Sequence, residues 1–326
     1  MRIGLLLSGA RPAPEITALA RAAEAAGVTD LWVSEDYFER GAFTLAAGVA
    51  AATEHATVGL GVLNPWTRHP MLTAMEFAAL DELSGGRALL GMGASNARWM
   101  REQAGVPFER PLTAVAEAVE IIRTALRGEH VAFEGRFFTV DARLAFTPVR
   151  PDPPIHLGAK GRRALDLAAR SADGVLLSLL SAPAYVAWAD ERLGGAHDLA
   201  AYVLASCGPD RAAARAAVRR DLAFYLGVHG DHDITRLAGL DAGTAARFRD
   251  GWLAGRPAED LVTDDLVDTF AVAGDLADCR AALDRLAAAG LRRAVLRDPG
   301  DAAVDGLLEL AASYGQHEQG TDHDRS

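Results

Sequence analysis

Short apolar runs alternate along this chain with longer stretches in which apolar residues recur at helical spacing. Thr57 to Val62 has the pattern of a strand, and Asn64-Pro65 interrupts it. Met71 to Leu83 has the pattern of a helix, and Pro70 precedes it where a first helical turn tolerates proline. The next strand starts at Ala88. The segment therefore predicts one strand–helix–strand unit.

The same unit recurs along the whole chain. We predict eight strands, which begin at residues 2, 30, 57, 88, 154, 174, 199 and 293. The predicted helices span residues 15–26, 44–53, 71–83, 110–127, 162–172, 183–193, 210–224, 276–289 and 303–314. Strict alternation predicts a parallel sheet covered by helices. Eight units in 326 residues fit a closed (β/α)8 TIM barrel, whose body takes about 250 residues. The alternative is an open doubly wound sheet, which would usually split into two domains at this length.

Two segments depart from the alternation. Residues 129–147 have alternating apolar residues around Glu134-Gly135, which predicts a small hairpin. Residues 227–270 are acidic and contain short helical pieces. We expect both insertions at the rim of one barrel domain that spans residues 1–314, where they could form a lid or a dimer surface. The polar tail, residues 315–326, is predicted to be disordered.

Composition narrows the possible functions. A net charge of −11 and the lack of a basic run argue against nucleic acid and anionic membranes as partners. No stretch is long and apolar enough to span a bilayer, and the first residues do not resemble a signal peptide. The two cysteines, Cys207 and Cys279, are far apart in the sequence and have no metal-ligand spacing. We therefore expect a cytoplasmic protein.

One strand–helix turn has the features of an anion site. The segment Ile155-His-Leu-Gly-Ala-Lys-Gly-Arg-Arg leads from a strand into a helix N-terminus, where backbone N–H groups favour an anion. Gly158 and Gly161 would allow close approach, and Lys160 is the single lysine of the chain. An ordinary turn with solvated basic residues explains the pattern equally well.

Two other kinds of site have less support. His229-Gly-Asp231-His232-Asp233 contains residue types that bind metals, but a polar loop explains it better. There is no nucleophile elbow and no paired Cys/His arrangement, so covalent catalysis has no support in the sequence.

Several motifs together resemble one family. They are Gly-Val-Leu-Asn-Pro-Trp-Thr-Arg-His-Pro, Leu-Asp-Glu-Leu-Ser-Gly-Gly-Arg-Ala, Pro-Ile-His-Leu-Gly-Ala-Lys-Gly-Arg-Arg-Ala-Leu and Ala-Asp-Gly-Val-Leu-Leu. In this order they are similar to the luciferase-like flavin and deazaflavin oxidoreductases, and most to the coenzyme F420-dependent methylenetetrahydromethanopterin reductase branch. The resemblance covers residues 1 to about 180 well and the last third loosely.

The resemblance implies a (β/α)8 barrel with the cofactor ring at the C-terminal ends of the strands, and a non-prolyl cis peptide bond between Gly61 and Val62. It implies that the cofactor phosphate lies in the turn after the fifth strand. The implied cofactor-binding residues are Gly61, Val62, Leu63, Asn64, Gly93, Ala94, Ser95, Asn96, Gly158, Ala159, Lys160 and Gly161.

The chain also departs from the family pattern. Many F420-dependent relatives read Ser/Thr-Asp-His-Phe/Tyr after the second strand, and this chain reads Ser34-Glu35-Asp36-Tyr37. After the fourth strand, Asn96 stands where relatives often have an acid. We expect Asp36 to transfer a proton or orient the substrate, with Glu35 second and Tyr37 and His69 as further candidates.

These inferences lead to one expected function and two alternatives. We expect an F420-dependent oxidoreductase, acting as a homodimer, that moves a hydride between deazaflavin C5 and a small organic substrate. The first alternative is an FMNH2-dependent monooxygenase on the same barrel. The second is a flavin-binding relative that has lost turnover.

Overall fold

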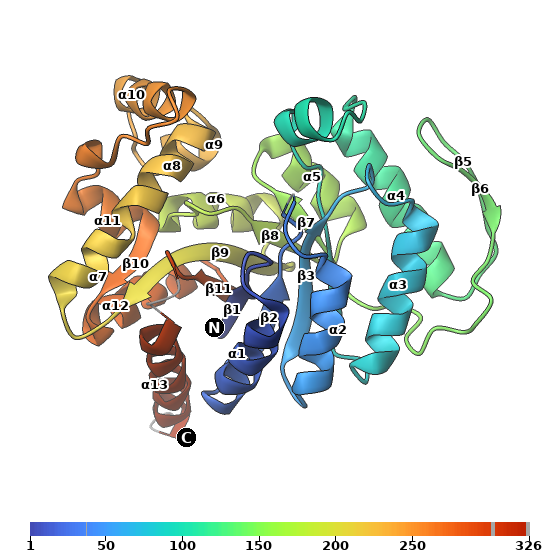
Figure 1. Cartoon of the computed structure of the whole chain (residues 1–326), viewed down its shortest axis with the longest axis horizontal. Helices are drawn as coiled ribbons and strands as arrows, with labels where there is room; N and C mark the ends of the chain where they lie inside the picture. The colour runs from blue at the N-terminus through green and yellow to red at the C-terminus, as the bar shows by residue number, and fades with distance from the viewer. Residues whose placement is uncertain (37, 301–303, 324–326) are drawn as a thin grey trace. The chain divides into compact units, whose positions relative to one another are not determined.

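The computed structural model describes residues 1–36, 38–300 and 304–323 (Figure 1). The chain divides into two compact units. Unit 1 consists of residues 1–6, 25–29 and 177–326, and unit 2 consists of residues 7–24 and 30–176. The single domain expected from the sequence therefore stays a prediction.

Eight strands form the closed parallel sheet of a (β/α)8 barrel. Their order is β9, β11, β1, β2, β3, β4, β7 and β8, and β8 pairs with β9 to close the ring. These strands are β1 (Arg2–Leu7), β2 (Asp30–Val33), β3 (Thr57–Leu63), β4 (Ala88–Met92), β7 (Ile155–Ala159), β8 (Gly174–Leu177), β9 (Asp198–Cys207) and β11 (Arg293–Arg297). Each starts within one residue of its predicted position, so the predicted barrel is confirmed.

Unit 2 contains four adjacent strands, β2, β3, β4 and β7, in parallel register. Most of its apolar strand residues are fully buried, because helices cover the sheet. The helices are α1 (Ala13–Ala25), α2 (Ala42–Ala52), α3 (Pro70–Leu83), η1 (Arg98–Gln103), α4 (Pro111–Leu126) and α5 (Arg162–Ser171). Pro70 begins α3 as predicted, and Gly85 and Gly86 end it with positive φ angles that favour glycine.

The hairpin predicted in residues 129–147 is present in unit 2. Strands β5 (Val131–Glu134) and β6 (Thr139–Ala142) pair antiparallel. Glu117 of α4 holds the hairpin tip, because its carboxylate accepts hydrogen bonds from the backbone N–H groups of Arg136, Phe137 and Phe138. The tip is therefore fixed against α4.

Unit 1 differs from the prediction in three places. The helix predicted over residues 210–224 is two helices, α7 (Arg211–Ala217) and α8 (Arg219–His229). The last helix, α13 (Val304–His323), continues past its predicted end at residue 314. A short strand that was not predicted, β10 (Ala271–Gly274), pairs parallel with the end of β9. Its four small residues are too few to show a strand period.

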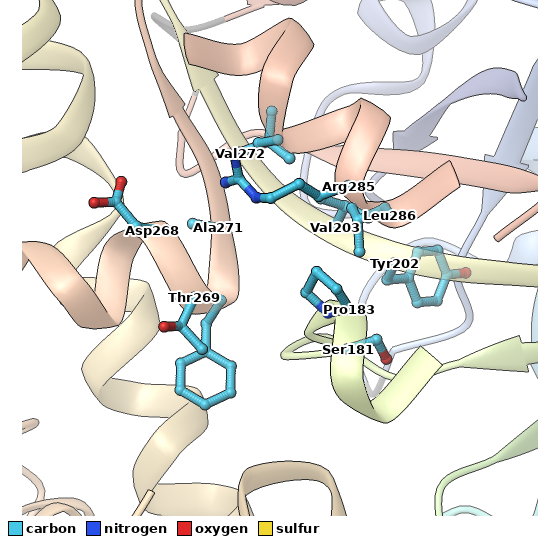
Figure 2. A pocket seen from close by; sticks show the side chains of 12 residues that line it. Ser181, Pro183, Tyr202, Val203, Asp268, Thr269, Ala271, Val272, Arg285 and Leu286 are labelled. Carbon is cyan, nitrogen blue, oxygen red and sulfur yellow. The ribbon is translucent and has the colours of Figure 1, made fainter. Parts of the chain in front are cut away.

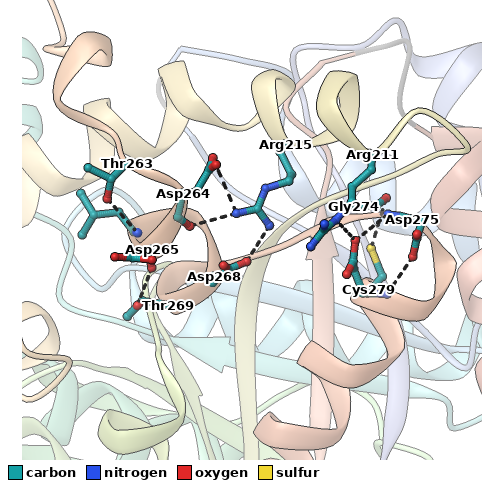
Figure 3. A network of polar contacts seen from close by, with 12 residues as sticks. Arg211, Arg215, Thr263, Asp264, Asp265, Asp268, Thr269, Gly274, Asp275 and Cys279 are labelled. Atoms are coloured by element: carbon teal, nitrogen blue, oxygen red, sulfur yellow. Dashed lines mark hydrogen bonds and ion pairs between the residues drawn. The ribbon is translucent and has the colours of Figure 1, made fainter.

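The predicted helical insertion, residues 227–270, lies in unit 1 and is helical, without a strand. Its elements are α9 (Asp233–Arg236), α10 (Ala242–Leu253), η2 (Glu259–Leu261) and α11 (Asp264–Phe270), while α6 (Pro183–Arg192) and α12 (Leu276–Ala288) lie outside it. Arg215 ties the insertion to α7: its guanidinium donates to Asp268 at 2.6 Å and to the Asp264 carbonyl at 3.0 Å (Figure 3). The hydrogen bond from Arg215 lowers the pKa of Asp268.

Among the described residues, none of the helices combines the length and the apolar composition that a membrane crossing requires.

Candidate functional site

The concave face of the unit 2 sheet can be located from two buried rings. Trp32 of β2 and His156 of β7 are fully buried, and their ring centroids lie 5.9 Å apart. Strands β3 and β4 separate β2 from β7, so these rings can meet only on the concave side of a curved sheet. The Trp32 ring lies over Gly59, where an added Cβ would be 2.5 Å from it. This face is the interior below the C-terminal ends of the strands.

The peptide bond between Gly61 and Val62 is cis, which confirms the prediction drawn from the family resemblance. The Val62 side chain lies across the neighbouring strands. A Cβ built on Gly93 would be 2.5 Å from Val62 Cγ2, and one built on Gly158 would be 3.0 Å from Val62 Cγ1. Gly93 and Gly158 therefore leave the space that Val62 fills, and Val62 itself is only half-buried. We call these three residues the Val62 shelf.

The loops after β3 and β4 are bonded to each other. The Gly93 N–H donates to the Leu63 carbonyl at 2.7 Å, and Trp66 Nε1 donates to the Ala94 carbonyl at 3.1 Å. Asn64 is buried, and its Oδ1 accepts the backbone N–H of Trp66 at 2.9 Å. Leu63 and Asn64 thus shape the loop beside the Val62 shelf.

Two buried hydroxyl groups near this end of the strands lack a hydrogen-bond partner among the described residues. They are Ser34 Oγ, just after β2, and Ser95 Oγ, in the loop after β4. Ser95 also has a positive φ of 62°. Buried hydroxyls are normally paired, so both atoms are suited to a polar ligand. Ser34 is a residue that the sequence prediction did not assign to the site.

The two carboxylates after β2 have different surroundings. Glu35 contacts Arg68, with Nη1 3.2 Å from Oε1 and 3.3 Å from Oε2. Asp36 is half-buried, and its carboxylate has no hydrogen bond or ion pair within the described ranges. Of the two, Asp36 is therefore the group available to a ligand. Tyr37 lies outside the described residues.

His69 and Asn96 both have structural roles. His69 caps α3, because its Nδ1 accepts the Met71 N–H at 3.2 Å, and its ring lies edge-on to Phe138. Asn96 Oδ1 accepts the Trp99 N–H at 3.0 Å at the start of η1. These contacts explain both residues without a cofactor, and their predicted roles in catalysis and cofactor binding stay predictions.

An aromatic cluster covers the loop after β3. The Trp66 ring centroid lies 5.6 Å from that of Phe108 and 5.4 Å from that of Phe137 at the hairpin tip. The three rings come from separate segments of unit 2 and are half-buried. The sequence prediction missed this cluster, because only the fold brings the hairpin to the loop after β3.

The turn after β7 is where the sequence predicts an anion site. Gly161 is the N-cap of α5, and no side chain caps this helix. Ala159 is buried, while Lys160, Arg162 and Arg163 are exposed. Although Lys160 retains contact with solvent, desolvation by the surrounding chain lowers the pKa of its ammonium group. The turn therefore combines helical N–H groups with local positive charge.

Unit 1 contains none of the predicted site residues. One of its pockets is lined by Tyr202, Asp268, Arg285 and neighbouring residues (Figure 2). His229 Nε2 lies 3.4 Å from Ser178 Oγ, and His232 caps α9. No group of three His, Cys, Asp or Glu residues suited to a metal ion occurs in the part of the chain that the structure describes.

The predicted site residues that the structure describes all lie in unit 2, after or at the ends of β2, β3, β4 and β7. Comparison with known proteins adds to this geometry. Residues 1–293 match the family model described as luciferase-like monooxygenase. The chain is 31% identical to a 5,10-methylenetetrahydromethanopterin reductase of Methanolobus tindarius, over 92% of this chain and 94% of that protein. It is 33% identical to the enzyme of the same name from Archaeoglobus fulgidus, over 87% and 90%.

A solved structure of a related reductase has the same fold. The coenzyme F420-dependent tetrahydromethanopterin reductase of Methanopyrus kandleri superposes with a TM-score of 0.85 at 27% identity, over 96% of this chain and 97% of that one. Family model, relatives and fold agree over nearly the whole chain, and the chain therefore belongs to the luciferase-like monooxygenase family.

Proposed function

We propose that this chain is an F420-dependent oxidoreductase that transfers a hydride between deazaflavin C5 and a small organic substrate. The observation that carries the proposal is the Val62 shelf, where two glycines keep side chains away from Val62 at the C-terminal ends of the strands. Related proteins whose names include F420 support the choice of cofactor.

The residues of unit 2 fit such a cofactor at two places. Near the C-terminal ends of the strands, the hydroxyls of Ser34 and Ser95, which lack a hydrogen-bond partner among the described residues, would bind polar atoms of the ring. At the turn after β7, the N-terminus of α5 and the Lys160 ammonium would hold the phosphate. The ring site and the anion site are thus built from neighbouring strands of one sheet.

The side chains of this chain have distinct tasks in the proposed reaction. When bound, F420 supplies the site at C5 that accepts or donates the hydride. Asp36 exchanges the accompanying proton with the substrate through its carboxylate, which has no partner among the described residues. Trp66, Phe108 and Phe137 exclude water at the edge of the loop after β3.

The proposal includes a cytoplasmic homodimer. The acidic composition and the two buried free cysteines fit a reducing cytoplasm. Leu72, Met75 and Leu83 of α3 are exposed by 42–53% and would be covered by a second copy.

The reaction with oxygen tests the proposal against a monooxygenase on the same barrel. Protein reconstituted with F420 or with FMN is reduced and mixed with oxygen in a stopped-flow instrument. We expect the F420 form to persist and to react with an organic hydride acceptor. A protein that binds FMN rather than F420, and whose reduced form reacts with oxygen and hydroxylates a substrate, would contradict the proposal.

A further inference from the structure

The carboxylate of Glu35 is bound on the outer side of the unit 2 sheet. Its partner Arg68 lies in the loop between β3 and α3, and the two side chains are 11% and 23% exposed. Phe43 of α2 and Glu76 of α3 also contact Arg68. Figure 1 shows α2 beside β3, with α3 next to α2. Because α2 and α3 cover the outer face of the sheet, Glu35 points away from the concave face.

Arg68 is held on three sides. Its Nη1 contacts both oxygens of Glu35, and its Nε lies 3.0 Å from Glu76 Oε2. Its guanidinium carbon lies 5.0 Å from the centroid of the Phe43 ring. Within residues 1–36, 38–300 and 304–323, Arg68 is the cation that contacts either carboxylate. The Arg68 guanidinium thus contacts two carboxylates and one aromatic ring at the same time.

The alternation of side chains after β2 explains why Asp36 lies on the other side of the sheet from Glu35. Trp32 points to the concave face, and successive side chains of an extended chain point to opposite sides. Ser34 and Asp36 follow Trp32 by two and four residues, so they share its side in an extended chain. Glu35 falls on the other side, where Arg68 lies.

We propose that Arg68 is a positioning residue that holds Glu35 on the outer side of the sheet and so leaves Asp36 as the carboxyl group that exchanges the proton. The role of Asp36 in this statement rests on the proposed function. The contact between Arg68 and Glu35 does not, and it can be tested without cofactor or substrate.

The physical consequence of losing Arg68 is specific to Glu35. A guanidinium stays protonated throughout the working pH range. Without it, Glu35 would be a largely buried carboxylate close to Glu76 with no cation beside it. Such a carboxylate takes up a proton at higher pH. Asp36, which does not contact Arg68, should be unaffected.

The test is a pH titration of the side-chain carboxyl groups by 13C NMR, with the Glu35 and Asp36 signals assigned from Glu35→Gln and Asp36→Asn. Arg68→Met removes the charge and retains the chain that packs on Phe43. We expect the Glu35 midpoint to lie at a higher pH than in the unmodified protein, because the cation beside the carboxylate is gone. Arg68→Lys, which keeps the charge, should return the Glu35 midpoint most of the way to its position in the unmodified protein.

Circular dichroism reports whether each variant folds, and Arg68→Gln replaces Arg68→Met if the latter does not. An unchanged Glu35 midpoint in the folded charge-removal variant would overturn the proposal, as would an equal shift of Asp36. If the midpoint shifts but the protein does not bind F420, the proposed function fails and the contact between Arg68 and Glu35 stands.

Discussion

At the scale of single residues, Glu35 and Asp36 are adjacent acids with opposite environments. Glu35 has a guanidinium on both of its oxygens, and Asp36 has no partner among the described residues. A group that is already paired must break that contact before it can exchange a proton with a substrate. In the proposed reaction, Asp36 is therefore the acid that exchanges the proton.

Replacing Asp36 tests this assignment. Asp36→Asn keeps the shape but cannot exchange a proton, so we expect unchanged F420 affinity and a loss of turnover of roughly 10²–10⁴-fold. Glu35→Gln should lose less. The measurements are a fluorescence titration with F420 and the rate of F420 absorbance change with a substrate that the unmodified protein turns over. Normal turnover by Asp36→Asn would move the proton transfer to Tyr37, His69 or solvent.

Lys160 is the other residue with a distinct electrostatic role. Desolvation disfavours its charged form, so the ammonium loses its proton at a lower pH than an ordinary lysine, whose pKa is about 10.4. The charge is present below the lowered pKa and is lost as the pH rises through it. Any contribution of the Lys160 charge to phosphate binding must therefore be lost over the same pH range.

We therefore expect F420 affinity to fall as the pH rises through the lowered pKa of Lys160, and to fall less in Lys160→Met. The affinity difference between the two proteins at neutral pH should shrink in high salt, because ions screen the charge. Titrations at several pH values and two salt concentrations measure both effects. Identical curves for the two proteins would show that Lys160 does not contact the cofactor.

At the scale of elements, the ends of β3, β4 and β7 are adapted to one side chain. Val62 fills the space above Gly93 and Gly158. A β-branched side chain has few rotamers and cannot easily move aside. The glycines of these two strand ends are therefore required by Val62 packing before any cofactor is considered.

Gly93→Ala is predicted to disturb this packing. Its Cβ would lie 2.5 Å from Val62 Cγ2, and overpacking of this kind costs about 1–3 kcal/mol. Gly158→Ala should cost less, since its contact is 3.0 Å. Adding Val62→Ala to Gly93→Ala should recover part of the stability in urea unfolding. An equal loss with and without Val62→Ala would show that Val62 is not the cause.

The strands and the hairpin could be predicted from the sequence, because apolar periodicity and turn residues are local signals. The strand β10 could not, since Ala271–Gly274 is short and made of small residues. The strand ends after which the candidate site residues lie could also be predicted. The contact between Arg68 and Glu35 could not, because the two residues are 33 positions apart and meet only in the fold.

At the scale of the whole molecule, the residues of the proposed chemistry lie in one of the two compact units of the chain. All predicted site residues that the structure describes lie in unit 2, and the family model spans most of the chain. The central claim is therefore that this chain binds F420 through its unit 2 strand ends and uses it for hydride transfer.

An equilibrium titration with F420 and with FMN tests this claim most directly. The purified protein is titrated with each cofactor, followed by fluorescence, for the unmodified chain and for Gly93→Ala. We predict F420 binding at least about tenfold tighter than FMN, a difference of about 1.4 kcal/mol, and weaker F420 binding by the variant. Tighter binding of FMN, or F420 binding that Gly93→Ala leaves unchanged, would contradict the account.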